Sequence, residues 1–189
     1  MFERFVPLQL ECLPKYTTLV PDVDEVTTKL QADSIKIESS TGVTRPMGDI
    51  LESAVKKQGY EPDASVAGDE VIHGARPKPF MVYRNLDLLD VNPIQSVVKV
   101  DDTVSGVGEA LEAGCWGVGI ARYSNYMNVN SLEEIDQLTD DDIARRLVHT
   151  RDLLGKAGAH YVIDGFGELL DVIRSEEHTS ELQSRTNLV

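Results

Sequence analysis

Hydrophobic positions along the chain follow two periods that alternate. Short runs rich in β-branched residues are separated by longer segments in which apolar residues recur every three to four positions. Runs of the first kind predict buried strands, and segments of the second kind predict amphipathic helices. Their regular alternation predicts an α/β fold, in which helices cross over a parallel sheet and cover it.

Five strands are expected from the short runs. They are residues 34–38 (SIKIE), 64–67 (ASVA), 96–100 (SVVKV), 116–120 (WGVGI) and 160–164 (HYVID). Helical periodicity and end signals predict the helices between them. The helices are expected over residues 2–13, from Pro21 and Asp22 past Leu30, from Met47 to a stop at Gly59, from Pro79 to Leu89, and over residues 104–113, 139–158 and 166–173.

Composition and charge narrow the class of protein. The 189 residues are 41% hydrophobic, which fits one soluble domain with a sizeable core. The formal net charge of −14 argues against nucleic acid or an anionic membrane as a partner, because both recruit a basic face. Cys12 and Cys115 lack zinc-ligand spacing, and the sequence shows no export signal and no long apolar run. We therefore expect a cytoplasmic protein.

Three segments that follow predicted strands or precede a helix carry the candidate chemistry. They are Ser39–Gly42 (SSTG), Gly74–Pro79 (GARPKP) and the pair Asp101–Asp102. Each segment alone has an ordinary explanation, namely a polar turn, a surface arginine and a solvated helix cap. Together they supply hydroxyl and amide donors, a fixed cation and ligands for a hard metal ion. These are the parts of a Mg²⁺-dependent phosphoryl site.

A dinucleotide-binding loop is a weaker interpretation. In GVGEALEAG, Gly106 and Gly108 are followed by the next glycine only at Gly114, which is too late for the GxGxxG motif. The segment would also lie inside a helix and not at its start. The sequence has no GxxxxGK[ST] loop either.

The order of these segments resembles the second, third and fourth signature motifs of the haloacid dehalogenase superfamily. More narrowly, residues 1–173 are similar to the later part of the phosphonoacetaldehyde hydrolase family. The runs that carry this resemblance are SSTGVTRPMGDIL, the arginine of RPKP, KVDDTVSGVGEALEAGCWGVG and GAHYVID. The resemblance implies a Rossmann-like core and hydrolysis of the carbon–phosphorus bond of phosphonoacetaldehyde to acetaldehyde and phosphate.

The same resemblance implies roles for particular residues. Asp102, with Asp101, would coordinate Mg²⁺, and Thr41 and Arg76 would serve catalysis. The phosphonate oxygens would be bound by Ser40, Thr41, Gly42 and Arg76. Two positions depart from the family pattern. Gly106 stands where a second acid is common, and Val43 stands where an aromatic residue is common.

Two functional groups of the family have no counterpart in this sequence. The family's nucleophilic aspartate lies in a DxxxT motif on an apolar strand, and its Schiff-base lysine lies in a helical cap, but no DxxxT motif on an apolar strand and no lysine in a matching context precede SSTG here. We therefore expect a truncated fragment that is inactive alone. Its expected parts are residues 1–20 from the end of the cap, residues 21–173 as the core, and residues 174–189 as a disordered tail resembling translated sequencing adapter.

Two alternative functions remain open at this point. A phosphomonoesterase of the same superfamily would keep Thr41, Arg76 and Asp102 but lack the cap lysine, and a non-catalytic protein would bind phosphate or Mg²⁺ without turnover. The resemblance implies a homodimer for the complete protein, with a small phosphonate as substrate. Without the family's first strand the sheet would have an unpaired central edge, so we expect residues 1–189 to aggregate or express poorly.

Overall fold

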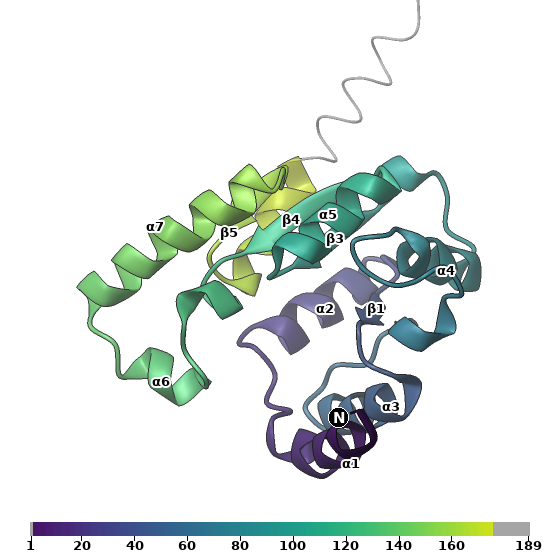
Figure 1. The fold of residues 1–189 in the computed structure, drawn as a ribbon. Helices are drawn as coiled ribbons and strands as arrows, with labels where there is room; N and C mark the ends of the chain where they lie inside the picture. Colours follow the sequence, from purple (N-terminus) through teal and green to yellow (C-terminus); the bar gives the residue numbers. More distant parts are fainter. Residues whose placement is uncertain (1, 176–189) are drawn as a thin grey trace, which may run out of the picture.

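The computed structural model describes residues 2–175, and the side chains of residues 6–175. Its helices are α1 (Phe2–Cys12), α2 (Val23–Ala32), α3 (Arg45–Lys56), α4 (Phe80–Leu89), α5 (Val104–Ala113), α6 (Leu132–Asp136) and α7 (Asp140–Lys156), and residues 169–175 are also helical. Its strands are β1 (Glu38–Thr41), β2 (Ala64–Ala67), β3 (Val98–Asp101), β4 (Trp116–Ile120) and β5 (Tyr161–Ile163). The expected α/β fold is confirmed (Figure 1).

All strand pairs are parallel, but the described strands form two separate sheets. β1 pairs with β2, and β3, β4 and β5 form a second sheet in that order. Within residues 2–175 no strand lies between β1 and β3, so each of these strands has one unpaired edge. The expected unpaired edge is therefore present in the structure.

A cavity of about 1010 Å³ lies beside these unpaired edges. Residues of β1 and β3 line it, among them Glu38, Ser40, Val98 and Lys99. The wall therefore combines apolar side chains with charged ones.

The sequence of β4 explains how helices cover both faces of the larger sheet. In WGVGI, Val118 and Ile120 belong to an apolar cluster that also contains Val26 and Leu30 of α2. The intervening glycines face the other side, and a Cβ at Gly119 would lie 3.1 Å from Leu154 of α7. The missing side chains let α7 approach the sheet closely.

Two predicted strands begin two or more residues later in the structure than in the sequence pattern. The strand expected at residues 34–38 is β1, at Glu38–Thr41, and the strand expected at 96–100 is β3, at Val98–Asp101. Parallel pairing of β1 with Ala64–Ala67 overrides the low strand propensity of serine. Consequently Ser40 and Thr41 lie in a strand, and only Gly42 of the expected SSTG loop follows it.

The outer parts of the chain add little to the site. α1 contacts α3, and the division at residue 20 stays a prediction. Of the tail expected from residue 174, residues 176–189 lie outside the described part.

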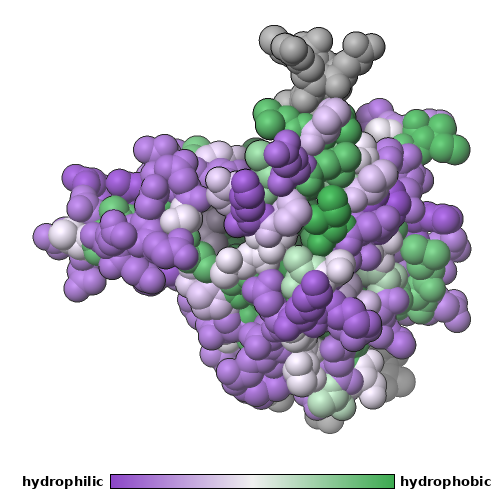
Figure 2. Space-filling model, turned by 90° about the horizontal axis from the view of Figure 1, so that it is seen from below, coloured by the Kyte–Doolittle hydropathy of each residue, from purple (hydrophilic) through white to green (hydrophobic). Residues whose placement is uncertain are grey.

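The face seen in Figure 2 is mainly hydrophilic, with an apolar strip that runs from its upper edge to its centre. Among residues 2–175, no helix is both long and apolar enough to cross a membrane.

Candidate active site

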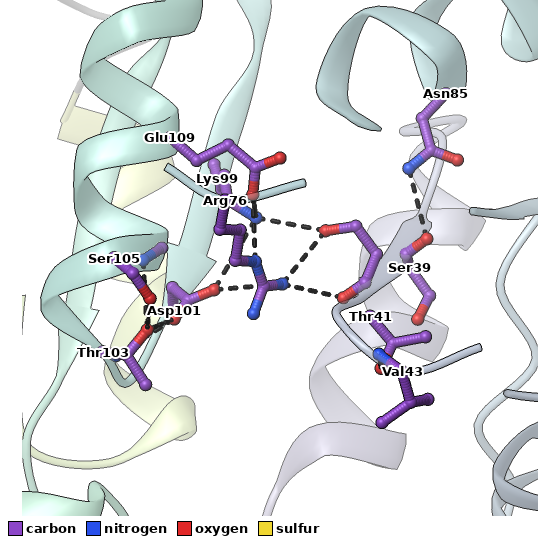
Figure 3. Close-up of polar contacts among 12 residues, drawn as sticks. Ser39, Thr41, Val43, Arg76, Asn85, Lys99, Asp101, Thr103, Ser105 and Glu109 are labelled. Carbon is purple, nitrogen blue, oxygen red and sulfur yellow. Dashed lines mark hydrogen bonds and ion pairs between the residues drawn. The ribbon is translucent and has the colours of Figure 1, made fainter. Parts of the chain in front are cut away.

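Arg76 joins the three segments singled out in the sequence. Its guanidinium donates to the backbone carbonyl of Ser40 at 2.8 Å and to the Ser40 hydroxyl at 3.3 Å. The same group lies 3.3 Å from Asp101 Oδ2, at the end of β3. Figure 3 shows Arg76 between the strand that carries Thr41 and the helix that carries Glu109. The structure thus brings SSTG, RPKP and the first aspartate of the acidic pair together.

Two further charged residues, which the sequence reasoning missed, lie in this cluster. Lys99 Nζ is 3.1 Å from Glu109 Oε2 and 3.2 Å from the Ser40 hydroxyl, and Arg76 Nε donates to Glu109 at 3.0 Å. The side chains of Lys99 and Glu109 are 5% and 0% exposed. Buried charges persist only when they are paired, which these are. The sequence did contain a signal for both residues, because a lysine stands inside a predicted apolar strand and a glutamate stands on the apolar face of a predicted helix.

The acidic pair divides into two environments. Asp101 Oδ1 accepts hydrogen bonds from the Thr103 amide at 3.0 Å and from the Thr103 hydroxyl at 2.7 Å. Asp102 is partly buried, and its backbone carbonyl accepts a hydrogen bond from the Ser124 hydroxyl at 2.6 Å. Burial, followed by the negative charge of Asp101, raises the pKa of Asp102. A cation beside Asp102 would relieve both effects.

The fit of this pair to a metal ion follows from its chemistry. Across residues 2–175 no group of three or more histidine, cysteine, aspartate or glutamate side chains is arranged to hold a metal. Mg²⁺ commonly uses only one or two carboxylates and completes its shell with water and phosphate oxygens. Asp102, with Asp101 next to it in the chain, therefore fits Mg²⁺ bound together with a phosphorylated or phosphonylated ligand, and the pair does not form an all-protein cage.

The hydroxyl and amide donors lie at the carboxyl end of β1. Thr41 is half-buried and accepts a hydrogen bond from the Val43 amide at 3.4 Å, whereas Gly42 is exposed at the start of the loop. A Cβ at Gly42 would meet nothing within 4 Å. The chain thus leaves open space directly beside this end of the strand, where an anion could accept hydrogen bonds.

Glu38 is a second titratable group that the sequence reasoning did not select. It lines the cavity, and its buried Oε2 atom has no hydrogen-bond partner within the described residues. Burial raises the pKa of Glu38 from 4.5 to about 7, against the lowering effect of Lys99 and with a smaller rise from Glu109. The Oε1 atom of Glu109 is likewise buried and has no hydrogen-bond partner within the described residues, although Oε2 of the same carboxylate is paired with Arg76 and Lys99.

Comparisons with known proteins identify relatives of this chain. No family model matches the chain. The chain is 40% identical to the phosphonoacetaldehyde hydrolase of Bacillus cytotoxicus, over 92% of this chain and 65% of that protein. It is 38% identical to the bifunctional phosphonoacetaldehyde hydrolase/aminoethylphosphonate transaminase of Clostridioides difficile, over 92% of this chain and 27% of that protein. The chain thus spans less than two thirds of these relatives.

Solved structures show the same relationship. A phosphonoacetaldehyde hydrolase like protein from Oleispira antarctica superposes with a TM-score of 0.88 at 34% identity, covering 92% of this chain and 62% of that one. A haloacid dehalogenase-like protein of unknown function from Agrobacterium tumefaciens shares the fold, with a TM-score of 0.69 at 20% identity, over 93% of this chain and 69% of that one.

Fold and site together define a haloacid dehalogenase-like protein. Its parallel strands and flanking helices bring Ser40, Arg76 and Asp101 into contact with one another. Within this superfamily, the chain belongs to the phosphonoacetaldehyde hydrolase family.

Proposed function

We propose that this chain forms the phosphonate-binding core of an enzyme that hydrolyses phosphonoacetaldehyde to acetaldehyde and phosphate. The observation that carries the proposal is the position of Arg76, which contacts both Ser40 of β1 and Asp101 of β3. In this proposal an anionic ligand accepts hydrogen bonds from this guanidinium, from the Thr41 hydroxyl and from the Gly42 amide together. Homology to phosphonoacetaldehyde hydrolases supports the choice of substrate.

Each residue has a separate task in this proposal. Thr41 and the Gly42 amide, with Ser40 behind them, orient the phosphonate oxygens by hydrogen bonds. Arg76 neutralises the negative charge that builds on the transferring phosphoryl group, which is the kind of fixed electrostatic support that contributes most to such reactions. Asp102, with Asp101 beside it, would hold Mg²⁺. When bound, that ion would supply a positive charge next to the phosphoryl oxygens.

We further propose that residues 1–189 bind the ligand without turning it over. Formation of a covalent intermediate needs a nucleophile, and the aldehyde needs an amine for an imine. The sequence before SSTG contains no DxxxT strand, and Lys15, Lys29 and Lys36 do not match the context of the Schiff-base lysine. In this proposal residues 1–189 therefore bind the ligand and provide electrostatic support, without supplying a nucleophile or an imine-forming amine.

Calorimetric titration with phosphonoacetaldehyde in the presence of Mg²⁺ tests the binding proposal. Arg76→Lys keeps a charge but loses the fork that reaches Ser40 and Asp101 together, so we expect binding to weaken at least tenfold. Arg84→Ala, at an exposed position of α4, is the matched control and should bind like the wild type. Equal affinity of the wild type and Arg76→Lys would refute the assignment of Arg76.

Acetaldehyde release, followed with an aldehyde-reducing enzyme, tests the proposal on turnover. The chain alone should release none. A longer protein that joins this core to a nucleophile strand and a cap lysine should release acetaldehyde and phosphate in equal amounts. Release of phosphate from phosphate esters, with none from phosphonoacetaldehyde, would instead identify a phosphomonoesterase.

A further inference from the structure

Gly106 and Asp101 compete for the same space. Gly106 lies in the first turn of α5, and a Cβ built on it would overlap the carboxyl group of Asp101. The backbone of Gly106 is not in the left-handed region, so its conformation alone does not demand glycine. Because Gly106 has no Cβ, the Asp101 carboxylate can pack directly against the start of α5. This position of the carboxylate over Gly106 is called the seat below.

The Asp101 carboxylate is held in this seat from two sides. Thr103, the N-cap of α5, donates to Oδ1 through its amide and its hydroxyl, while that hydroxyl also accepts from the Gly106 amide at 3.1 Å. On the other side Oδ2 lies 3.3 Å from Arg76 and 3.7 Å from Lys99. The Asp101 side chain is only 5% exposed. Its hydrogen bonds and ion pairs leave it little freedom to turn toward Asp102.

We propose that Asp101 is a positioning residue whose carboxylate, packed over Gly106, holds the Arg76 guanidinium in place and does not itself bind a cation. Any side chain at position 106 would displace this carboxylate and release Arg76 from β3. Only the role of Arg76 in neutralising a phosphoryl group rests on the proposed function. The seat itself is a property of the fold.

A double-mutant cycle in thermal unfolding tests the seat. Gly106→Ala should lower the midpoint by roughly 4–8 °C, because it overpacks a buried site. In an Asp101→Gly background the same change should raise the midpoint by roughly 1–3 °C, since alanine favours a helix over glycine. Gly108→Ala in the same helix, where a Cβ meets Pro77 at 3.4 Å, should behave alike in both backgrounds. An equal loss from Gly106→Ala in both backgrounds would overturn the proposal.

The chemical reactivity of Arg76 tests its positioning. Asp101→Asn keeps the size of the side chain but removes its charge, so Arg76 should react with phenylglyoxal at least threefold faster, as measured by peptide mass spectrometry. Arg45 is the internal control, because its side chain is 26% exposed against 22% for Arg76 and is paired with other carboxylates. A rate for Arg76 that does not change in Asp101→Asn contradicts the proposal.

Mg²⁺ titration separates the two aspartates. Asp101→Asn should keep the Mg²⁺ affinity within about threefold of the wild type, whereas Asp102→Asn should lower it more than tenfold. An equal loss in both variants would make Asp101 a ligand and refute the proposed division. A wild-type chain that binds no Mg²⁺ would refute the cation in the proposed function, while the cycle and the Arg76 reactivity would still decide the role of Asp101.

Discussion

Glu38 gives the structure a pH dependence that can be worked out in advance. Its pKa is raised from 4.5 to about 7 by burial beside the cavity. Below pH 4.5 the carboxyl group is protonated in both the folded and unfolded states. As the pH rises from 4.5 to 7, the unfolded chain releases this proton first, so the free energy of unfolding falls across that window.

The size of the effect follows from the two pKa values. A pKa difference of one unit corresponds to about 1.4 kcal/mol. A pKa of 7 in the folded state against 4.5 in the unfolded state would therefore lower the free energy of unfolding by about 3.4 kcal/mol at high pH. Glu38 is only partly buried as a residue, although its Oε2 atom is fully covered. Solvent screening reduces the effect, and we expect about 1.5 kcal/mol.

Glu38→Gln tests this reasoning, because the amide keeps the shape and cannot ionise. Urea unfolding at pH 5 and pH 8 should show the variant gaining about 1.5 kcal/mol over the wild type between the two conditions. Glu112→Gln removes a charge from an exposed position of α5 and should track the wild type at both pH values. If Glu38→Gln also tracks the wild type, Glu38 does not carry an elevated pKa.

Three further predictions concern the scaffold. Thr139→Ala should cost about 1 kcal/mol in urea unfolding, because the hydroxyl caps α7 by accepting from the Asp142 amide, and Thr139→Ser should restore most of this loss. Gly119→Ala should lower the free energy of unfolding by about 1–2 kcal/mol, because its Cβ would crowd Leu154 of α7. Gly155→Ala, where a Cβ meets nothing within 4 Å, should be neutral or stabilising. Residues 1–189 should self-associate in sedimentation velocity through the unpaired edges of β1 and β3, and a cooperatively unfolding monomer would contradict this.

Local patterns were sufficient to predict most elements. The bounds of β2, β4 and α5 agree with the sequence expectation because alternation, a glycine stop and an N-cap threonine mark them locally. β1 was misplaced, since its position depends on pairing with β2 and not on the propensity of serine. Pairing across a sheet is a tertiary property that one strand's sequence does not encode.

The candidate site was predictable in part for a similar reason. Strand order brings the ends of β1 and β3 to one side, so Ser40, Arg76 and Asp101 could be grouped from sequence alone. Lys99 and Glu109 could be recognised as unusual in apolar surroundings, but their pairing with Arg76 depends on how α5 packs on β3. The close approach of Asp101 to Gly106 likewise depends on how α5 packs against the end of β3.

The charge balance of the site links the two proposed ligands. Arg76 and Lys99 are paired with Asp101 and Glu109, Arg76 also acts on Asp102, and Lys99 also acts on Glu38. Two cations therefore meet three carboxylates, or four when Glu38 is ionised, a formal charge of −1 or −2. A phosphonate dianion entering this cluster alone would meet repulsion, and a divalent cation would reverse the balance.

We therefore expect Mg²⁺ and inorganic phosphate to bind cooperatively. Saturating phosphate should tighten Mg²⁺ binding about tenfold or more, and saturating Mg²⁺ should tighten phosphate binding by the same factor, because coupling is reciprocal. Calorimetric titrations in both orders measure the two factors. Independent binding would mean that Arg76 and the Gly42 backbone amide, and not the cation, supply the positive potential that an anion requires.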